Sequence, residues 1–473
     1  MFRRCRRISI MMVLVLLLAQ VGWAAAVKGT QPILQKIRYS QTPQVVRIVL
    51  DVTTLPNFVA NLAGDPDQLI INFDDVLNQL SASEMLFNDP VVSSLQISAT
   101  ETGQQRAIIN LKKMVDYKVF TLTNPNRIVI DIKKEVDQKS EEEIAPGIKH
   151  ISLMRSTAAG PISAHIIDLT PNGNYLIKPV LSNDAISGLE KLQSIAGRNK
   201  GIVAVNASYF APNGEIIGLL KIDGEIVSTS DVTRTAFGVL SDGKMIIDQI
   251  DCNSSIILPD GRTVAITGVN HERGQDDLIL YNNYYDSMTA TNQFGSDYIV
   301  SNEKIIAIAH GRAAIPPGGI VLSAHGTMEK VLVGLKVGDT IKIVQTMGEL
   351  WDKTRYVLGA GPRLVKNGSV LLGSKVEEFP ADITTGRAPR TAVGITKDQH
   401  VILVTVDGRQ ESSIGMTLLE LASFMQEWGA VDAMNLDGGG SSEMVINGRV
   451  LNNPSDGRER SVGDALMIVP KNQ

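Results

Sequence analysis

Residues 435–442 carry the clearest chemical signal in this chain and read Asn-Leu-Asp-Gly-Gly-Gly-Ser-Ser. Three consecutive glycines weaken a helix or a strand, so they are typical of places where the backbone bends sharply or approaches a ligand. The segment offers one carboxylate, one carboxamide and two hydroxyl groups, on Asp437, Asn435, Ser441 and Ser442. Successive backbone amides could form an anion-binding nest at Gly438, Gly439 and Gly440. The pattern indicates a site, and the alternative is a plain turn between a helix and a strand.

Two other polar residues follow apolar runs in the same way as Asp437. Asn206 follows residues 202–205, and Asp407 follows residues 401–406. Polar side chains at the ends of buried strands commonly build sites on mixed scaffolds. Asp407-Gly408 taken alone is more typical of a β-turn.

Three arginines stand beside Gly, Pro or Thr at the start of apolar runs: Arg234, Arg363 and Arg390, the last followed by Thr391. Arginine stays charged and presents paired donors that suit phosphate or carboxylate. Three such positions in an acidic protein indicate an anion-binding wall, and the alternative is a set of surface ion pairs.

His325 lies before Gly326 and is a candidate for proton transfer, although a lone histidine in a loop is more often structural. No cofactor is firmly implied. Ca²⁺ or Mg²⁺ would suit the oxygen atoms of Asp407 and Asp437, but no dense carboxylate cluster accompanies them, so no metal ligands are assigned. The chain contains no G-x-S-x-G elbow, no H-E-x-x-H zinc signature and no Walker loop.

The elements that must position these residues are mostly strands. Short apolar runs recur from residue 162 to residue 469, and clear helical patterns are few. One helix is predicted over 187–196. Another is predicted over 418–428, with Thr417 as its N-cap and Glu420 completing a capping box. Residues 148–473 therefore read as one large α+β domain rich in strands.

The first 26 residues have the three parts of a secretory signal: four arginines, an apolar run over 10–19, and Ala24-Ala25-Ala26. The run is short for a membrane span, and an uncleaved anchor is the alternative. The net charge of −5 becomes −9 without these arginines, which argues against nucleic-acid binding. We therefore expect an exported protein of the periplasm or cell envelope that does not span the membrane after cleavage.

Residues 33–135 contain an internal repeat. Residues 47–52 and 69–73 recur at a constant offset as 106–111 and 128–132. Short strands broken by prolines predict an all-β sandwich of two similar halves. The charged run at 137–143, followed by Pro146-Gly147, predicts a solvated linker over 136–147.

The sandwich pattern at 33–135 resembles the AMIN domain, an exported module. That resemblance implies attachment to the cell envelope through peptidoglycan or another wall polymer. The alternative is a generic structural β-domain.

The remaining motifs together resemble the phosphodiester glycosidase family. They occur in the family's order at 205–210, 234–238, 270–273, 321–326, 361–363, 387–394, 406–409 and 435–442. The resemblance implies hydrolysis of a glycosyl-1-phosphodiester at the anomeric carbon. Asp437 is then the first choice for the carboxylate beside the sugar, Asp407 the second, and His325 a proton donor. Substrate binding falls to Asn206, Phe210, Arg234, Arg363, Arg390, Thr391, Asn435, Gly438, Gly439, Gly440, Ser441 and Ser442.

Two other functions stay open. A non-catalytic envelope protein could bind anionic glycans or peptidoglycan through the same pocket. A peptidoglycan amidase is indicated only by the N-terminal module and would need zinc, for which no ligand set is evident.

Overall fold

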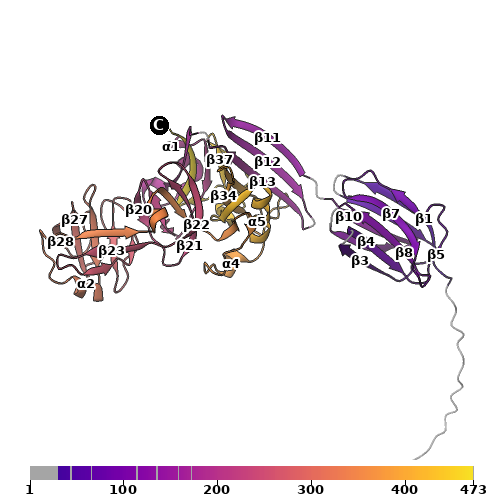
Figure 1. Cartoon of the computed structure of the whole chain (residues 1–473), viewed down its shortest axis with the longest axis horizontal. Coiled ribbons are helices and arrows are strands. Elements are labelled where there is room, and N and C mark those ends of the chain that lie inside the picture. The colour runs from indigo at the N-terminus through magenta and orange to yellow at the C-terminus, as the bar shows by residue number, and fades with distance from the viewer. Residues whose placement is uncertain are drawn as a thin grey trace, which may run out of the picture. The chain divides into compact units, whose positions relative to one another are not determined.

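A computed structural model describes residues 30–42, 45–64, 67–112, 115–134, 137–157, 159–171 and 173–471. The chain divides into two compact units, one ending at Lys133 and the other beginning at Lys134 (Figure 1). The predicted signal peptide at 1–26 lies outside the described residues. Among the helices that are described, none combines the length and the apolar character needed to cross a bilayer.

The first unit consists of two five-stranded sheets around one apolar core. One sheet has the order β5 (Leu77–Asn78), β1 (Ile33–Gln41), β2 (Val45–Val52), β10 (Arg127–Lys133), β9 (Tyr117–Leu122). The other has the order β3 (Phe58–Gly64), β4 (Asp67–Phe73), β8 (Gln105–Leu111), β7 (Val92–Ala99), β6 (Glu84–Leu86). Buried and exposed residues alternate along β2 and β4, as expected for strands with one face in a core. The predicted all-β sandwich is confirmed.

The internal repeat is built by exchange of strands between its halves. β2 pairs with β10, and β4 pairs with β8, so each central pair combines one strand from each half. Ile48 lies opposite Ile130, and the equivalent positions Ala107 and Ile71 also lie opposite each other. The repeat therefore gives the sandwich an internal two-fold relationship with matched register.

The linker predicted over 136–147 is wrong. Most of it is strand β11 (Asp137–Ala145), which pairs with β12 (Ile148–Ser156) at the edge of the largest sheet. An edge strand has only one neighbour, so its acidic side chains remain in water, and charges on such strands discourage edge-to-edge pairing. Arg155 then joins Asp137 to Glu427 through two ion pairs.

The second unit is organised around an eight-stranded sheet that packs on a five-stranded sheet. The first has the order β11, β12, β13 (Pro161–Leu169), β35 (Val401–Val406), β34 (Arg390–Thr396), β36 (Ala430–Asn435), β32 (Arg363–Lys366), β33 (Ser369–Val370). The second has the order β14 (Tyr175–Leu181), β40 (Asp464–Pro470), β16 (Val203–Asn206), β37 (Met444–Ile446), β38 (Arg449–Val450). Their shared core contains Val205, Val393, Leu403, Leu436 and Leu466, all nearly or completely buried.

Helix α5 (Leu418–Glu427) covers the other face of the eight-stranded sheet (Figure 1). Thr417 caps it, and the capping box with Glu420 is present, as predicted. Leu418, Leu421, Ala422 and Met425 form its buried stripe. The helix predicted over 187–196 is instead α1 (Leu192–Arg198), because Glu190–Lys191 forms strand β15.

The remaining strands form a lobe with its own apolar core. One sheet has the order β20 (Glu225–Ser228), β19 (Leu220–Ile222), β31 (Thr354–Gly359), β21 (Arg234–Leu240), β22 (Met245–Ile250). A second has the order β24 (Thr263–Ala265), β23 (Asn253–Ile257), β30 (Lys342–Thr346). The third has the order β25 (Gly268–Val269), β26 (Leu278–Tyr281), β29 (Ile320–Ala324), β27 (Ser296–Ser301), β28 (Lys304–Ala309).

Short elements complete the second unit. They are η1 (Ser182–Asp184), β17 (Tyr209–Phe210), β18 (Ile216–Ile217), α2 (Thr327–Leu332), α3 (Glu349–Asp352), α4 (Ala381–Thr384), η2 (Gly439–Ser441) and β39 (Ser461–Val462).

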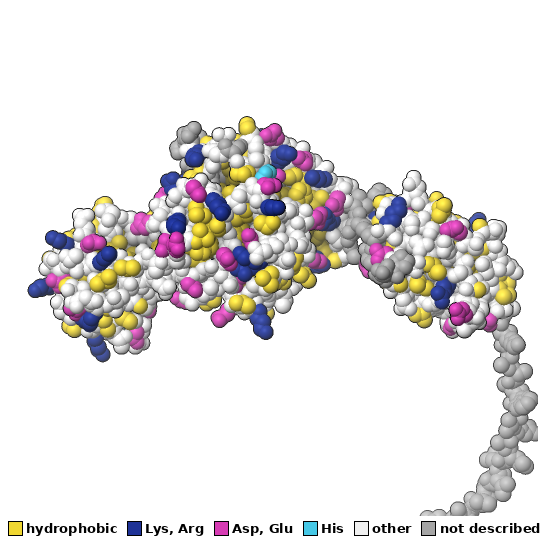
Figure 2. Space-filling model, viewed as in Figure 1, with side chains coloured by type: hydrophobic (Ala, Val, Ile, Leu, Met, Phe, Trp, Pro, Cys, Tyr) yellow, Lys and Arg dark blue, Asp and Glu magenta, His cyan; other side chains and the backbone are white. Residues whose placement is uncertain are grey.

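Most neighbouring strands run antiparallel, and strands far outnumber helices, so the predicted α+β class is confirmed. Acidic and basic side chains are interspersed over the visible surface (Figure 2).

Candidate active site

Three segments that are distant in the sequence meet where β16, β34 and β36 lie together. Asn206, at the end of β16, donates a hydrogen bond to the backbone carbonyl of Asp437 at 2.7 Å. Its Oδ1 accepts from the Thr391 hydroxyl at 2.7 Å and from the Glu443 amide at 3.1 Å. Asn206, Thr391 and Asn435 are all buried, so this contact set fixes the loop that follows β36. The structure thus brings together four of the predicted site residues.

Two of the three glycines in this loop, Gly439 and Gly440, face a guanidinium group, and Gly438 lies against a backbone carbonyl. A Cβ atom on Gly438 would lie 3.0 Å from the Pro389 carbonyl and 4.0 Å from Cδ of Arg390. A Cβ atom on Gly439, whose φ is +63°, would lie 3.4 Å from Nη2 of Arg409. On Gly440 it would overlap the guanidinium of Arg460. The glycines therefore answer three local demands: a close backbone carbonyl at Gly438, a positive φ at Gly439 and a closely approaching guanidinium at Gly440.

The amides of this loop do not form the predicted anion nest. The Gly438 amide donates to Oδ1 of its own neighbour, Asp437, at 2.8 Å. The Gly439 amide donates to the Pro389 carbonyl at 2.9 Å. Both donors are engaged inside the loop, so the anion-binding role predicted for these two amides is wrong in this conformation.

Asp437 is half-buried, and burial raises the pKa of its carboxyl to about 6. Hydrogen bonds from Ser441 and Gly438 and the charge of Arg460 act in the opposite direction. The group is therefore mostly ionised at neutral pH but close enough to its pKa to take part in proton transfer. The buried hydroxyl of Ser442, at the end of the same loop, has no hydrogen-bond partner among the described residues.

Tyr209 lies beside this carboxylate. Its hydroxyl donates to the Gly361 carbonyl at 3.1 Å and accepts from Nδ2 of Asn435 at 3.0 Å. Burial, followed by the negative charge of Asp437, raises the pKa of Tyr209, so the phenol stays protonated. Sequence reasoning did not place Tyr209 in the site, although it lies between Asn206 and Phe210.

Two arginines around Tyr209 make no ion pair with any described residue. The guanidinium of Arg234 lies 4.3 Å from the ring centroid of Phe379, which itself lies 5.6 Å from the ring of Tyr209. Arg390 is buried and donates to three backbone carbonyls, those of Ile383, Gly386 and Met416. Burial lowers the pKa of Arg390. A buried cation without an ion pair, such as Arg390, is costly, so together with the half-buried Arg234 it indicates a site that receives an anion.

Asp407 is linked to the end of the glycine loop through the side chain of Asn452. Its Oδ1 accepts from Nδ2 of Asn452 at 3.1 Å, and Asn452 also donates to the Ser442 carbonyl at 3.0 Å. Asp407 is only 5 % exposed, and burial raises its pKa. This geometry favours a positioning role over contact with a substrate.

Two further acids surround Asn206. Asp464 is completely buried and accepts from the amide and the hydroxyl of Ser208 at 2.7 and 2.8 Å. Burial raises the pKa of Asp464 to about 7. Burial and the neighbouring Glu459 raise the pKa of Glu443 to about 9. Neither acid was predicted, although Glu443 directly precedes the apolar strand β37 and Asp464 is the first residue of β40.

Three predicted residues do not join this cluster. Arg363 forms an ion pair with Asp248, and Lys366 shares that carboxylate at 3.0 Å. His325 lies after β29 in the separate lobe, where its amide donates to the Asp277 carbonyl at 3.0 Å. Phe210 packs on apolar cores, since successive residues of a strand point to opposite faces.

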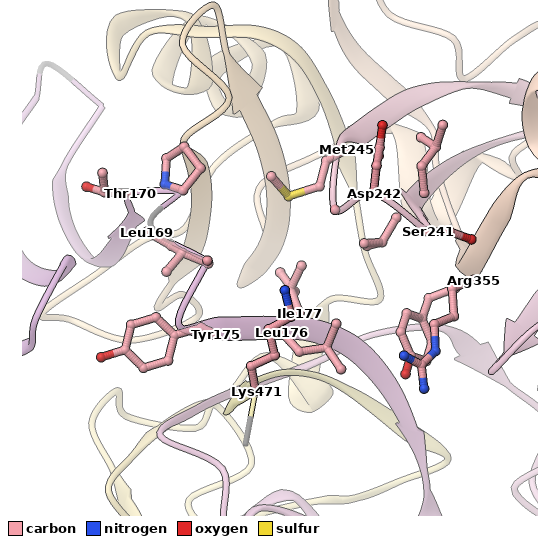
Figure 3. A pocket seen from close by; sticks show the side chains of 16 residues that line it. Leu169, Thr170, Tyr175, Leu176, Ile177, Ser241, Asp242, Met245, Arg355 and Lys471 are labelled. Carbon is pink, nitrogen blue, oxygen red and sulfur yellow. The ribbon is translucent and has the colours of Figure 1, made fainter. Parts of the chain in front are cut away.

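A separate pocket of about 310 Å³ lies elsewhere in the second unit (Figure 3). Its walls are largely apolar and include Leu169, Ile177 and Met245, with Arg355 and Lys471 among its polar residues. It contains none of the predicted site residues. Among the described residues, no group of three or more His, Cys, Asp or Glu side chains is arranged to hold a metal ion.

Comparisons with known proteins give two family matches. Residues 289–469 match the phosphodiester glycosidase model, and residues 94–161 match the AMIN domain model. The first match contains Arg390, Asp407 and Asp437 but stops short of Asn206 and Arg234. The second begins in β7 of the first unit and continues to the start of β13 in the second.

Individual relatives are similar over shorter stretches. The chain is 44 % identical over 80 residues to the SPbeta prophage-derived uncharacterized protein YomE of Bacillus subtilis, covering 17 % of this chain and 12 % of that protein. It is 36 % identical over 151 residues to N-acetylglucosamine-1-phosphodiester alpha-N-acetylglucosaminidase of Mus musculus, covering 29 % of each. The aligned parts are therefore less than a third of these relatives.

A crystal structure of a hypothetical protein from Synechocystis shares the fold, with a TM-score of 0.65 and 20 % identity over 94 % of this chain and 81 % of that one. Its low identity supports the fold alone. The two models therefore give residues 289–469 a match to the phosphodiester glycosidase family and residues 94–161 a match to the AMIN domain.

Proposed function

We propose that this protein is an exported glycosidase that hydrolyses a glycosyl-1-phosphodiester at the anomeric carbon, within a cell-wall polymer or exopolysaccharide. The observation that carries this proposal is the meeting of the Asp437 carboxylate with several guanidinium groups around one glycine turn. A phosphodiester bears one negative charge, and the sugar ring becomes positive as its bond to phosphate breaks. The guanidinium groups match the negative charge of the phosphodiester, and the Asp437 carboxylate matches the positive charge that develops on the sugar ring.

Water supplies the atom that replaces phosphate at the anomeric carbon. The bond between that carbon and the phosphate oxygen breaks, and its electron pair leaves with the phosphomonoester. One proton is released from the attacking water. Asp437 would either attack the carbon first or take this proton, and its pKa of about 6 allows both roles near neutrality.

The surrounding polar residues hold the reacting groups in place. Asn435 and Tyr209 would hold the protein wall beside Asp437 in place, since their side chains hydrogen-bond to each other and to the Gly361 carbonyl. Asn206 would act through Asp437, since its side chain is already bonded to the loop. Ca²⁺ or Mg²⁺ would suit the carboxylates of Asp437 and Asp407 chemically, but no step here depends on a metal.

An assay of the mature protein tests this proposal. Methyl phosphodiesters of α-linked N-acetylglucosamine and glucose would be incubated with it, with and without EDTA, and free sugar would be measured by chromatography. Asp437→Asn should lower kcat by about 10³-fold or more, because it removes the charge without removing the side chain. Asp398→Asn, at an exposed turn of the same unit, is the matched control.

If no diester releases sugar while the protein still binds anionic glycans, the non-catalytic envelope protein replaces this proposal. The AMIN domain supports an envelope location and contact with peptidoglycan. Sedimentation of the full chain and of residues 134–473 with purified peptidoglycan would compare their binding. Equal binding by both would remove that role from the first unit.

A further inference from the structure

Arg409 is the cation least explained by the fold. It is exposed, and it has no hydrogen bond or ion pair with any residue in the described part of the chain. Its Nη1 and Nη2 atoms would lie 3.6 and 3.4 Å from a Cβ atom on Gly439. A surface arginine without a partner normally extends into water, so its position over bare backbone is a specific feature.

The backbone at Arg409 is also unusual. Its φ is +61°, in the left-handed region that costs a residue other than glycine about 1 kcal/mol or more. The preceding Gly408 has no room for a Cβ atom, because Pro389 and Gly415 lie within 2.9 Å of that position. Pro389 and Gly415 thus pack closely against the backbone of this turn, and the Arg409 guanidinium lies near Gly439.

Two more guanidinium groups reinforce the positive charge at this place. Burial and the nearby charge of Arg409 lower the pKa of Arg390, which pairs with no carboxylate in the described part of the chain. Arg460 lies over Gly440 and pairs with Asp456 at 2.7 Å, with its side chain 42 % exposed. Asp456 pairs with Arg460, and the charge of Arg460 also acts on Asp437. Arg409 and Arg390 form no ion pair with a described residue, so their charges add to the positive potential against the glycine loop.

We propose that Arg409 and Arg460 form a phosphate-binding site over Gly439 and Gly440, which holds the phosphate of the diester beside Asp437. This inference rests on the proposed function and assigns the phosphate to residues outside the earlier prediction, in place of Arg363. Arginine suits this task because its planar donors match two phosphate oxygens at once. The glycines allow the guanidinium groups to lie flat against the loop.

Binding of inorganic phosphate to the full chain tests the site without requiring turnover. Isothermal titration would compare the unaltered protein with Arg409→Ala, Arg409→Lys and Arg460→Ala. Arg409→Ala should weaken binding by about 10- to 100-fold, as expected for loss of a charged hydrogen bond. Arg409→Lys should retain part of it. Arg312→Ala is the matched control, because Arg312 is also exposed with a positive φ of 50° but lies in the other lobe.

Phosphate affinity that is unchanged in Arg409→Ala, or absent in the unaltered protein, would overturn the site. Equal losses in Arg409→Ala and Arg312→Ala would also overturn it, since they would reflect net charge alone. Turnover of the methyl phosphodiesters separates this result from the proposed function. If phosphate binding depends on Arg409 but no diester is hydrolysed, the phosphate site stands and the proposed enzymatic function fails. If diesters are hydrolysed equally well by Arg409→Ala, the enzymatic function stands and the phosphate site fails.

Discussion

The side chain of Asn206 donates a hydrogen bond to the backbone carbonyl of Asp437 at 2.7 Å, although 231 residues separate them in the sequence. The same side chain accepts from Thr391 and from the Glu443 amide. One buried carboxamide therefore joins the end of β16 to β34 and to both ends of the glycine loop. The position of the proposed catalytic carboxylate depends on this contact.

Asn206→Ala should destabilise the protein by about 2–4 kcal/mol, because it leaves buried polar groups of Asp437, Thr391 and Glu443 without partners. Denaturant unfolding followed by circular dichroism would measure the change in the free energy of unfolding. Gln293→Ala, which removes an exposed carboxamide, should change it far less. A loss below about 1 kcal/mol for Asn206→Ala would show that water replaces the missing contacts and that Asn206 does not fix the loop.

The pH dependence of turnover should report Asp437. Since its pKa is raised to about 6, kcat/KM should fall roughly tenfold per pH unit below that value as the carboxylate is protonated. The charge of Arg460 lowers this pKa, so Arg460→Ala should move the acidic limb to higher pH. Arg458→Ala, two residues away and exposed, should leave the limb in place. A limb that stays fixed in Arg460→Ala would assign it to another group.

Gly440→Ala tests why the third glycine is present. The added Cβ atom meets the guanidinium of Arg460 and the carboxylate of Asp456, which are flexible and partly exposed. We expect stability to change by less than about 1 kcal/mol, because these side chains can move, whereas phosphate affinity and kcat/KM should both fall. Gly197→Ala, in α1 with open space around it, should preserve phosphate affinity and kcat/KM and raise the free energy of unfolding by at most about 1 kcal/mol. Unchanged phosphate affinity in Gly440→Ala would show that close approach of Arg460 is not needed.

The pattern of polar residues at strand ends was sufficient to predict that these residues lie together, whereas their role in a site stays a prediction. Asn206, Thr391, Asn435 and Asp437 meet because polar residues at the ends of apolar strands must gather where those strands converge. The sandwich was predictable from alternating apolar residues along its strands, and helix α5 was predictable from its Thr-Glu capping box.

Contacts between distant segments were not predictable in this way. Glycine and proline beside Arg363 indicated a site, but nothing local reveals that Asp248 on β22 neutralises it. The sequence did not predict Asp464 and Glu443 as parts of the site, because a single acid at the start of an apolar strand is usually exposed to solvent. The acidic run at 137–143 predicts a linker but forms an edge strand, because composition does not distinguish a solvated chain from an exposed edge strand.

A chain of hydrogen bonds at the edge of the large sheet leads to the last prediction. Nδ1 of His165 lies 3.0 Å from Nε2 of His150, whose Nδ1 lies 3.0 Å from Glu142. Burial, with the nearby His150, lowers the pKa of His165 to about 4. The unfolded chain, in which histidine has its ordinary pKa near 6.5, therefore binds more protons between about pH 4 and 6.5. His165 thus makes the free energy of unfolding fall as pH drops through that range.

His165→Asn should remove this loss. Between pH 7.5 and pH 5, the free energy of unfolding should fall by about 1–2 kcal/mol less in the variant than in the unaltered protein. Urea unfolding at both pH values gives the difference, and the subtraction cancels contributions from Asp437, Asp464 and Glu443, whose raised pKa values act in the opposite direction. His310→Gln, at an exposed position, is the control. Identical pH dependence in His165→Asn and the unaltered protein would mean that His165 is protonated in the folded state as readily as in the unfolded chain.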